Sequence, residues 1–421
     1  TKGIIGDTIK IHNQSQRNKI PSKWKKLIPA IKEIEDVSNN DKLDIEFAIT
    51  KNNIIIFQVR PLTTLKKDTD SYIEKHVKNE IKKNQKKFLK IQSKKSTINK
   101  KIIFSNMTDW NPAEIIGSNP RKLDYSLYDY LVMKNSWSEG RTLLGYNNNQ
   151  NSSLMEEFSG RPYVNVKTSF YSLIPSTINT KIQKKLINYF LKKLEKNPYL
   201  HDKVEFEILF TCYDFTLKKR MEDLINYGFT RTEIKIIKNQ LIDFTNELIK
   251  KTPDILKQTV SFLKILEDKR KKSRDRISDY KSKLSNAETL LKDCKKYGVV
   301  QFTAVARLAF IANILLKGLT EISNVKKLDI DKFMNSISTP VTEFQNDLYN
   351  LEIKKITKAD FLDKYGHLRP GTYDITIERY DNMSELLDNL KFLHIKKRLK
   401  AKKTYQKDLQ NIIKKHGLIF K

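Results

Sequence analysis

The chain has few of the residues that disulfide-linked, zinc-binding or β-rich proteins need. Its 421 residues include two cysteines, Cys212 and Cys294, and six scattered histidines. A disulfide framework and a structural zinc site are therefore not expected, and we predict a reducing, cytoplasmic location. With only 12 glycines and 11 prolines, the composition disfavours sandwiches and barrels and favours long helices. The length itself predicts two or three domains.

Long uninterrupted apolar runs are also missing. The most apolar stretch, residues 299–319, contains Gln301, Arg307, Asn313 and Lys317. It falls short of the roughly 18 consecutive apolar residues that a membrane-spanning helix needs. We predict a buried core helix here, in a protein that does not cross a membrane.

Acidic residues are scarce relative to basic ones, with 49 Asp and Glu against 80 Lys and Arg and a net charge of +31. A basic field of this size attracts polyanions, so a helical nucleic-acid-binding protein is one hypothesis. The basic residues are mostly lysines spread over the whole chain, and no motif of a nucleic-acid-binding fold is present. A coding bias that fills exposed helix faces with lysine explains this pattern better.

Two apolar runs near the N-terminus, residues 43–50 and 54–60, flank Lys51-Asn52-Asn53 and predict a β-hairpin with a three-residue loop. Such a loop pairs Thr50 with Ile54, Glu46 with Gln58 and Asp44 with Arg60. Because side chains alternate along a strand, Asp44, Glu46, Gln58 and Arg60 should share one face. The other face should be apolar, with Ile45, Phe47, Ile49, Ile55, Phe57 and Val59.

The polar face of this hairpin allows two interpretations. Carboxylate and amide oxygens suit Mg²⁺, and a guanidinium forks onto phosphate oxygens, so Asp44, Glu46, Gln58 and Arg60 would suit a magnesium-nucleotide site. Alternatively, the hairpin is an ordinary half-buried ribbon whose solvated face carries cross-strand ion pairs. From the residues alone, the ordinary hairpin is favoured.

The segments Asp44-Ile-Glu-Phe-Ala48 and Ile56-Phe-Gln-Val-Arg60 resemble the end of the ATP-grasp domain in the pyruvate phosphate dikinase and phosphoenolpyruvate synthase family. The resemblance implies ATP and Mg²⁺ as cofactors. It assigns Glu46 and Gln58 to the metal and nucleotide, Arg60 to phosphate, and Asp44 to a second carboxylate. A complete domain of that family needs a longer N-terminal part than the 43 residues before Asp44. We therefore expect a fragment, a split gene product or a degenerate homologue.

The remainder of the chain reads as a lysine-rich helical linker, residues 67–100, and a mostly helical region, residues 101–421. An alternating stretch at residues 159–170 places Arg161, Tyr163 and Asn165 on one face, as candidates for substrate binding. Candidate helices run near 179–197, 203–226, 231–250, 254–292, 302–318, 329–350 and 382–416, with a helical hairpin expected within 254–292.

A polar loop at residues 365–374 carries three candidate catalytic groups. His367 could deprotonate an acceptor hydroxyl, Arg369 could hold an anion, and Asp374 could orient the histidine or pair with an arginine. Purely structural roles are equally available: a loop-stabilising hydrogen bond for His367 and a buried ion pair for Arg161. We expect the tryptophans at 110 and 137 to be core residues.

The segments Asp109-Trp-Asn-Pro-Ala-Glu114, Gly160-Arg-Pro-Tyr-Val-Asn165 and Tyr365-Gly-His-Leu-Arg369 resemble the helical middle domain of the same family, including the rifampin phosphotransferases. That resemblance implies a small-molecule phosphoryl acceptor and a phosphohistidine on a swivelling domain. None of the six histidines has the family's Gly-rich context, so the swivelling domain is expected in cis or in trans. The expected fold is α+β and predominantly helical: the C-terminal part of an ATP-grasp domain at residues 1–66, then the linker and an acceptor domain. A non-catalytic binding module with this fold is the main alternative.

Overall fold

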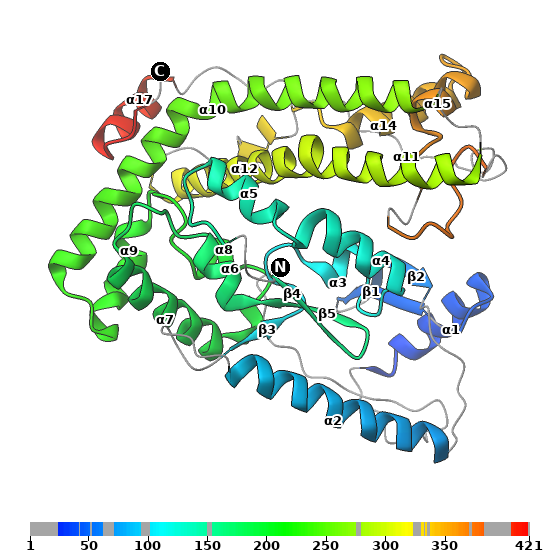
Figure 1. Cartoon of the computed structure of the whole chain (residues 1–421), viewed down its shortest axis with the longest axis horizontal. Coiled ribbons are helices and arrows are strands. Elements are labelled where there is room, and N and C mark those ends of the chain that lie inside the picture. The colour runs from blue at the N-terminus through cyan, green and yellow to red at the C-terminus, as the bar shows by residue number, and fades with distance from the viewer. Residues whose placement is uncertain are drawn as a thin grey trace. The chain divides into compact units, whose positions relative to one another are not determined.

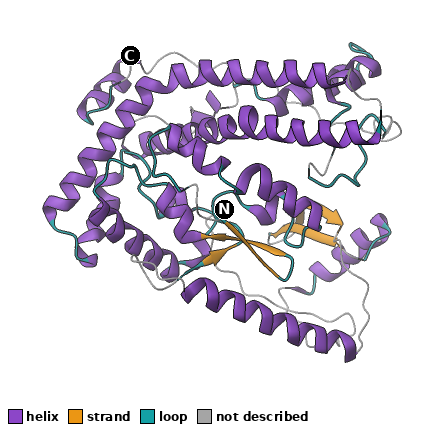
Figure 2. Cartoon of the chain, in the orientation of Figure 1, coloured by secondary structure: helices purple, strands orange, loops and turns teal. Residues whose placement is uncertain are grey.

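The computed structural model describes residues 24–41, 43–50, 53–61, 71–93, 102–149, 154–274, 279–322, 330–331, 333–334, 337–369, 373–382 and 406–419. Most of these residues are helical, and the described strands form two small sheets (Figure 2). The predicted predominantly helical α+β class is confirmed at that level. The chain divides into two compact units, Thr1–Gln85 and Lys86–Lys421, with the division inside helix α2 (Ser71–Ser93).

The first unit contains helix α1 (Leu27–Ser38) and a hairpin of β1 (Leu43–Ile49) and β2 (Ile54–Pro61). The predicted pairs Asp44–Arg60 and Glu46–Gln58 are confirmed, but Phe47 pairs with Ile56 and Ile49 with Ile54. Phe57 therefore has no partner, and a β-bulge absorbs the extra residue.

The bulge corrects the predicted register at the turn end of the hairpin. Beyond it, Ile55 pairs with Ala48 instead of lying with Phe47 and Ile49, and Phe57 is 67% exposed. The expected apolar face is thus wrong for Ile55 and Phe57. On β1 the alternation holds: Asp44 and Glu46 are exposed, whereas Ile45, Phe47 and Ile49 are half-buried. Trp24 packs edge-on against Phe47, with ring centroids 6.4 Å apart.

The second unit begins with the last part of α2, which packs on a three-stranded antiparallel sheet. The strand order is β3 (Phe104–Ser105), β5 (Arg161–Asn165) and β4 (Met155–Phe158). Lys87 Nζ of α2 donates a hydrogen bond to the Glu157 carbonyl at 2.7 Å, and the Phe88 and Phe104 rings lie 6.0 Å apart. Residues 76–85 of α2 are mostly exposed.

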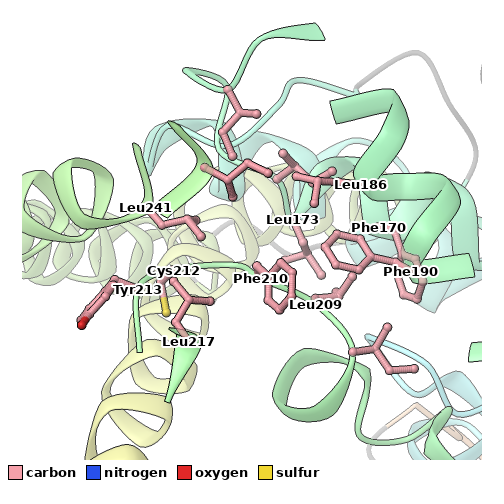
Figure 3. Close-up of a cluster of buried hydrophobic side chains, with 14 of the residues drawn as sticks. Phe170, Leu173, Leu186, Phe190, Leu209, Phe210, Cys212, Tyr213, Leu217 and Leu241 are labelled. Atoms are coloured by element: carbon pink, nitrogen blue, oxygen red, sulfur yellow. The ribbon is translucent and has the colours of Figure 1, made fainter. Parts of the chain in front are cut away.

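The other described α-helices of the second unit pack around one large and two smaller apolar clusters. In chain order they are α3 (Pro112–Ile115), α4 (Lys122–Tyr128), α5 (Ser136–Leu143), α6 (Val166–Ser172), α7 (Thr180–Lys196), α8 (Val204–Glu207), α9 (Leu217–Met221), α10 (Arg231–Arg274), α11 (Tyr280–Asp293), α12 (Val300–Ile322), α14 (Pro340–Glu352), α15 (Lys358–Tyr365) and α17 (Gln406–Lys415). Figure 3 shows part of the core, where Phe170, Phe190 and Phe210 meet. This packing anchors the segment after α8 from which Phe210 comes.

Several predicted helices differ from the observed ones. The predicted separation of helices 231–250 and 254–292 is wrong, because α10 runs through Pro253 as one bent helix of 44 residues (Figure 1). The expected helical hairpin is formed by α10 and α11, which pack side by side. The predicted helix 203–226 is interrupted after α8, where Arg220 holds the chain by donating to Asp214 at 2.6 Å and to the Leu209 carbonyl at 2.7 Å. Most of the predicted helix 382–416 lies outside the described residues.

The stretch Tyr280–Ile322 is, among the described residues, the one helical segment long and apolar enough to cross a membrane by length and composition. Core helices of soluble proteins pass the same test, and 44% of its most apolar part is buried. Arg307, in the middle of α12, forms a buried ion pair with Glu205. A buried ion pair with another segment of the protein is what a core helix would make, which agrees with the sequence-based prediction.

Candidate functional site

The polar face of the hairpin brings three of its four predicted ligands into contact. Arg60 Nη2 lies 3.4 Å from Glu46 Oε1 and also donates to Gln58 Oε1. Asp44 is exposed opposite Arg60 in the pairing register. The side chains of Arg60 and Glu46 are 53% and 59% exposed. These groups can therefore rearrange around an incoming ion with little cost in lost contacts.

The four polar residues of this face do not line the cavity described in the first unit. The cavity found in the first unit, about 450 Å³, lies at the turn end and is lined by Lys26, Ile49, Thr50, Asn53, Ile54 and Ile55. Among the described residues, no group of three or more His, Cys, Asp or Glu side chains is arranged to hold a metal. Any metal bound here would need further ligands from the nucleotide or from parts of the chain outside the described residues.

The three predicted catalytic residues of the 365–374 loop do not form a unit. His367 is exposed, whereas Asp374 Oδ1 accepts hydrogen bonds from Thr376 N at 2.9 Å and Thr376 Oγ1 at 2.7 Å. Arg121 adds an ion pair to the same carboxylate at 3.4 Å. The Thr376 donors, with help from Arg121, lower the pKa of Asp374. Arg369 donates to the Asp374 backbone carbonyl at 3.4 Å, whereas the Asp374 carboxylate pairs with Arg121. Among the described contacts, the arginine pairing predicted as one alternative for Asp374 is therefore the one observed.

The predicted substrate-binding strand is shorter than expected. β5 ends at Asn165, because Asn165 Oδ1 accepts a hydrogen bond from Thr168 N at 3.3 Å and caps α6. The expected alternation holds along β5, since Arg161 is exposed and Pro162 and Val164 are buried. Of the three predicted residues, Asn165 thus has a structural partner.

Tyr163 lines a cavity of about 360 Å³ together with Ile103, Phe104, Ser105, Asn106, Leu194, Glu195, Pro198 and His201. Ser105 Oγ lies 3.0 Å from His201 Nδ1 on its wall. A serine hydroxyl beside an imidazole can be activated as a nucleophile. Here the pair also ties β3 to the segment after α7, and Thr108 Oγ1 reinforces that tie by donating to the His201 carbonyl at 2.7 Å.

A buried ion pair between Asp109 and Arg141 was not predicted from the sequence. Arg141 Nη1 donates to Asp109 Oδ2 at 3.0 Å, and Nη2 donates to Oδ1, so the two groups form a bidentate fork. Both side chains are at most 4% exposed. Ser169 Oγ donates to Asp109 at 2.6 Å, and Arg141 also donates to Ser172 Oγ at 2.7 Å. The pair therefore joins the segment before α3 to α5 and α6.

A second buried pair, Arg307 with Glu205, lies in the same region. Arg307 Nη1 donates to Glu205 Oε2, and Nη2 donates to Thr211 Oγ1 at 3.1 Å. The two side chains are 3% and 9% exposed. Burial lowers the pKa of the Arg307 guanidinium, because low-dielectric surroundings disfavour its charged form.

A cavity of about 60 Å³ lies between the two pairs. Its walls are Asp109, Trp110, Arg141, Glu205, Thr303, Ala306, Arg307 and Phe310. Within the part of the chain that the structure describes, three buried N–H donors of these wall residues have no acceptor: Trp110 Nε1, Arg141 Nε and Arg307 Nε. An unpaired buried donor typically costs about 1–3 kcal/mol, so three of them around one cavity indicate space for an acceptor.

The backbone around Trp110 is strained. Asp109 has φ 61° and Asn111 has φ 44°, both in the left-handed region that non-glycine residues seldom adopt. The conformation is held by the Asp109 fork and by Tyr128 Oη, which donates to the Trp110 carbonyl at 2.6 Å. Strain of this kind persists only where surrounding contacts fix it, and it is common at functional sites.

Close packing of α5 on α12 sets the spacing between the two arginines. A Cβ placed on Gly140 would lie 2.6 Å from both Thr303 Cβ and the Val300 carbonyl oxygen. Only glycine fits there without a shift of one helix. Arg141 is the next residue on α5, and Arg307 lies one turn beyond Thr303 on α12, so this contact fixes the walls of the cavity.

Comparison with known proteins adds no identification. No family model matches the chain, no curated protein matches it, and no solved structure matches it.

Proposed function

We propose that the chain is part of an ATP-dependent phosphotransferase of the phosphoenolpyruvate synthase and pyruvate phosphate dikinase type, acting in the cytoplasm. The hairpin supplies metal and phosphate contacts to Mg-ATP through Glu46, Gln58 and Arg60, with Asp44 beside them. The helical region holds a small-molecule acceptor. The phosphohistidine belongs to a swivelling domain in cis or in trans.

One observation carries this proposal: the contact of Arg60 with both Glu46 and Gln58 on one exposed hairpin face. An amide, a carboxylate and a guanidinium in reach of one another match the needs of a magnesium-bound triphosphate. Catalysis in this chemistry is mainly positioning and charge neutralisation, so ligand placement is the property to test.

Isothermal titration calorimetry of the full chain with Mg-ATP tests the hairpin. Removing a charged ligand should weaken binding about tenfold to a hundredfold, so Glu46→Gln and Arg60→Ala should each raise Kd by that factor. Glu33→Gln, a change to an exposed carboxylate of α1, is the matched control and should leave Kd unchanged. Binding that survives both hairpin changes would refute the assignment.

A non-catalytic binding module is the second candidate. It is favoured by the lack, among the described residues, of any cluster of three metal-ligating side chains. Calorimetry separates the two candidates: no heat with Mg-ATP, either from this chain or from a longer one carrying a phosphohistidine domain, supports the binding module. A strongly salt-dependent shift of RNA in a gel would instead support the basic nucleic-acid-binding alternative.

A further inference from the structure

The cavity between the two buried ion pairs has the chemistry of a ligand site. Its walls contain two guanidiniums and two carboxylates, so their formal charges cancel. An anion placed there would leave one buried negative charge uncompensated, which is unfavourable. A neutral oxygen that accepts hydrogen bonds can satisfy two of the free N–H donors of Trp110, Arg141 and Arg307, and it adds no charge.

Aromatic side chains lie next to these charged walls. The rings of Trp110 and Phe302 lie 6.1 Å apart, and Phe302 is 61% exposed. Phe302, Ala306 and Phe310 are spaced four residues apart on α12, so they share one side of that helix. An exposed apolar ring next to buried polar groups suits a ligand with a carbon face and hydroxyl groups.

We propose that this cavity binds a hydroxyl-bearing small molecule of the polyol or monosaccharide class. One hydroxyl enters the cavity, accepts from two of the three free N–H donors and donates to a carboxylate of the cavity wall; the carbon skeleton lies against Trp110 and Phe302. The cavity has room for roughly four waters at about 15 Å³ each, which is enough for a hydroxymethyl arm and too little for a whole sugar ring. The claim that the bound molecule is the phosphoryl acceptor rests on the proposed function. The claim that the cavity binds such a molecule does not.

The three tryptophans of the chain give a direct test. The full chain labelled with 5-fluorotryptophan should show three ¹⁹F signals, assigned by Trp→Phe changes. Titration with D-glucose, D-galactose, myo-inositol and glycerol should shift the Trp110 signal saturably for at least one of them and leave that of Trp24 in place. The proposal fails if none of the four shifts it, or if phosphate or acetate binds more tightly.

Two substitutions on α12 locate the bound molecule. Ala306→Leu fills the cavity and replaces no residue of either ion pair, and it should weaken binding at least tenfold, whereas Ala309→Leu on the exposed side should not. Phe302→Ala should weaken binding roughly threefold to tenfold, with Tyr280→Ala, a change to another exposed ring, as its control. Equal binding by the Ala306→Leu and Ala309→Leu variants would overturn the site. Mg-ATP calorimetry reports on the hairpin alone, so the two proposals can fail separately.

Discussion

Arginine–carboxylate pairs occur in both units, but in opposite environments. Arg60 and Glu46 on the hairpin are more than half exposed, whereas Arg141 and Asp109 in the second unit are almost fully buried. In water such a pair contributes little and its members stay free to bind something else. In the interior the same pair is fixed, and removing one partner leaves an uncompensated charge. The exposed pair is therefore suited to reversible binding of an ion, whereas the buried pair is suited to a fixed position in the wall of a cavity.

The largest effect should come from breaking a buried pair. Asp109→Ala leaves the Arg141 guanidinium buried without its counter-charge, and we expect a loss of about 3–5 kcal/mol in the free energy of unfolding. Urea denaturation followed by circular dichroism measures it. Glu247→Ala, which breaks an exposed pair with Lys251 at 3.6 Å, is the control and should cost under about 1 kcal/mol. Similar losses in the two variants would remove the distinction between buried and exposed pairs.

A smaller loss should follow from changing the spacing of the buried pairs. Gly140→Ala puts a methyl group against Thr303 and the Val300 carbonyl, and overpacking of this kind costs about 1–3 kcal/mol. Elsewhere in a helix the same change would be favourable. Gly298→Ala is the comparison, since its new methyl group would meet a movable Leu266 side chain at 3.3 Å. Thermal unfolding of both variants decides whether the α5–α12 contact is as tight as described.

The Asp374 carboxylate is intermediate in exposure and gives a pH-dependent test. Its pKa in the folded protein lies below the ordinary value of 3.8. The ionised Asp374 carboxylate therefore stabilises the folded protein. This contribution is fully present above about pH 4 and is lost as the pH falls through the lowered pKa. Asp374→Ala should thus lower Tm at pH 7 and have a smaller effect near pH 3. An equal change at both pH values would mean that the charge of Asp374 plays no part.

The smallest effect on stability is expected on the hairpin. Glu46→Ala and Arg60→Ala should each change the free energy of unfolding by less than about 1 kcal/mol, because both side chains are largely in water. Chemical denaturation monitored by Trp24 fluorescence reports on this unit, since Trp24 packs on Phe47. A larger loss would show that these residues are structural and would weaken their assignment to a nucleotide.

The hairpin shows what sequence reasoning captures. The predicted three-residue loop is wrong, because Ile49 and not Thr50 pairs with Ile54. The Asp44–Arg60 and Glu46–Gln58 pairs were still predicted correctly, because the bulge offsets the one-residue shift at the turn. The error at Ile55 and Phe57 arose from a one-residue bulge, and a short apolar run contains no signal that distinguishes the residues a bulge can skip. The sequence pattern also did not show that α10 continues through Pro253. A proline inside a helix is unfavourable, and core packing on both sides of it offsets that cost here.

The buried cluster was beyond reach of local patterns because its partners are far apart in the chain. Asp109 meets Arg141 and Ser169, and Glu205 meets Arg307, so each contact depends on the folded core. One signal was present: an arginine in the middle of a predicted core helix needs a buried partner. The sequence could not say which carboxylate supplies it.

The left-handed backbone on either side of Trp110 restricts how this segment can vary. Positions 109 and 111 both have positive φ, which aspartate, asparagine and glycine tolerate and β-branched residues do not. Asparagine at 109 would keep the conformation and lose the charge, whereas valine would lose both. Backbone geometry therefore restricts substitution at these two positions before side-chain chemistry does, and aspartate, asparagine and glycine fit there with the least strain.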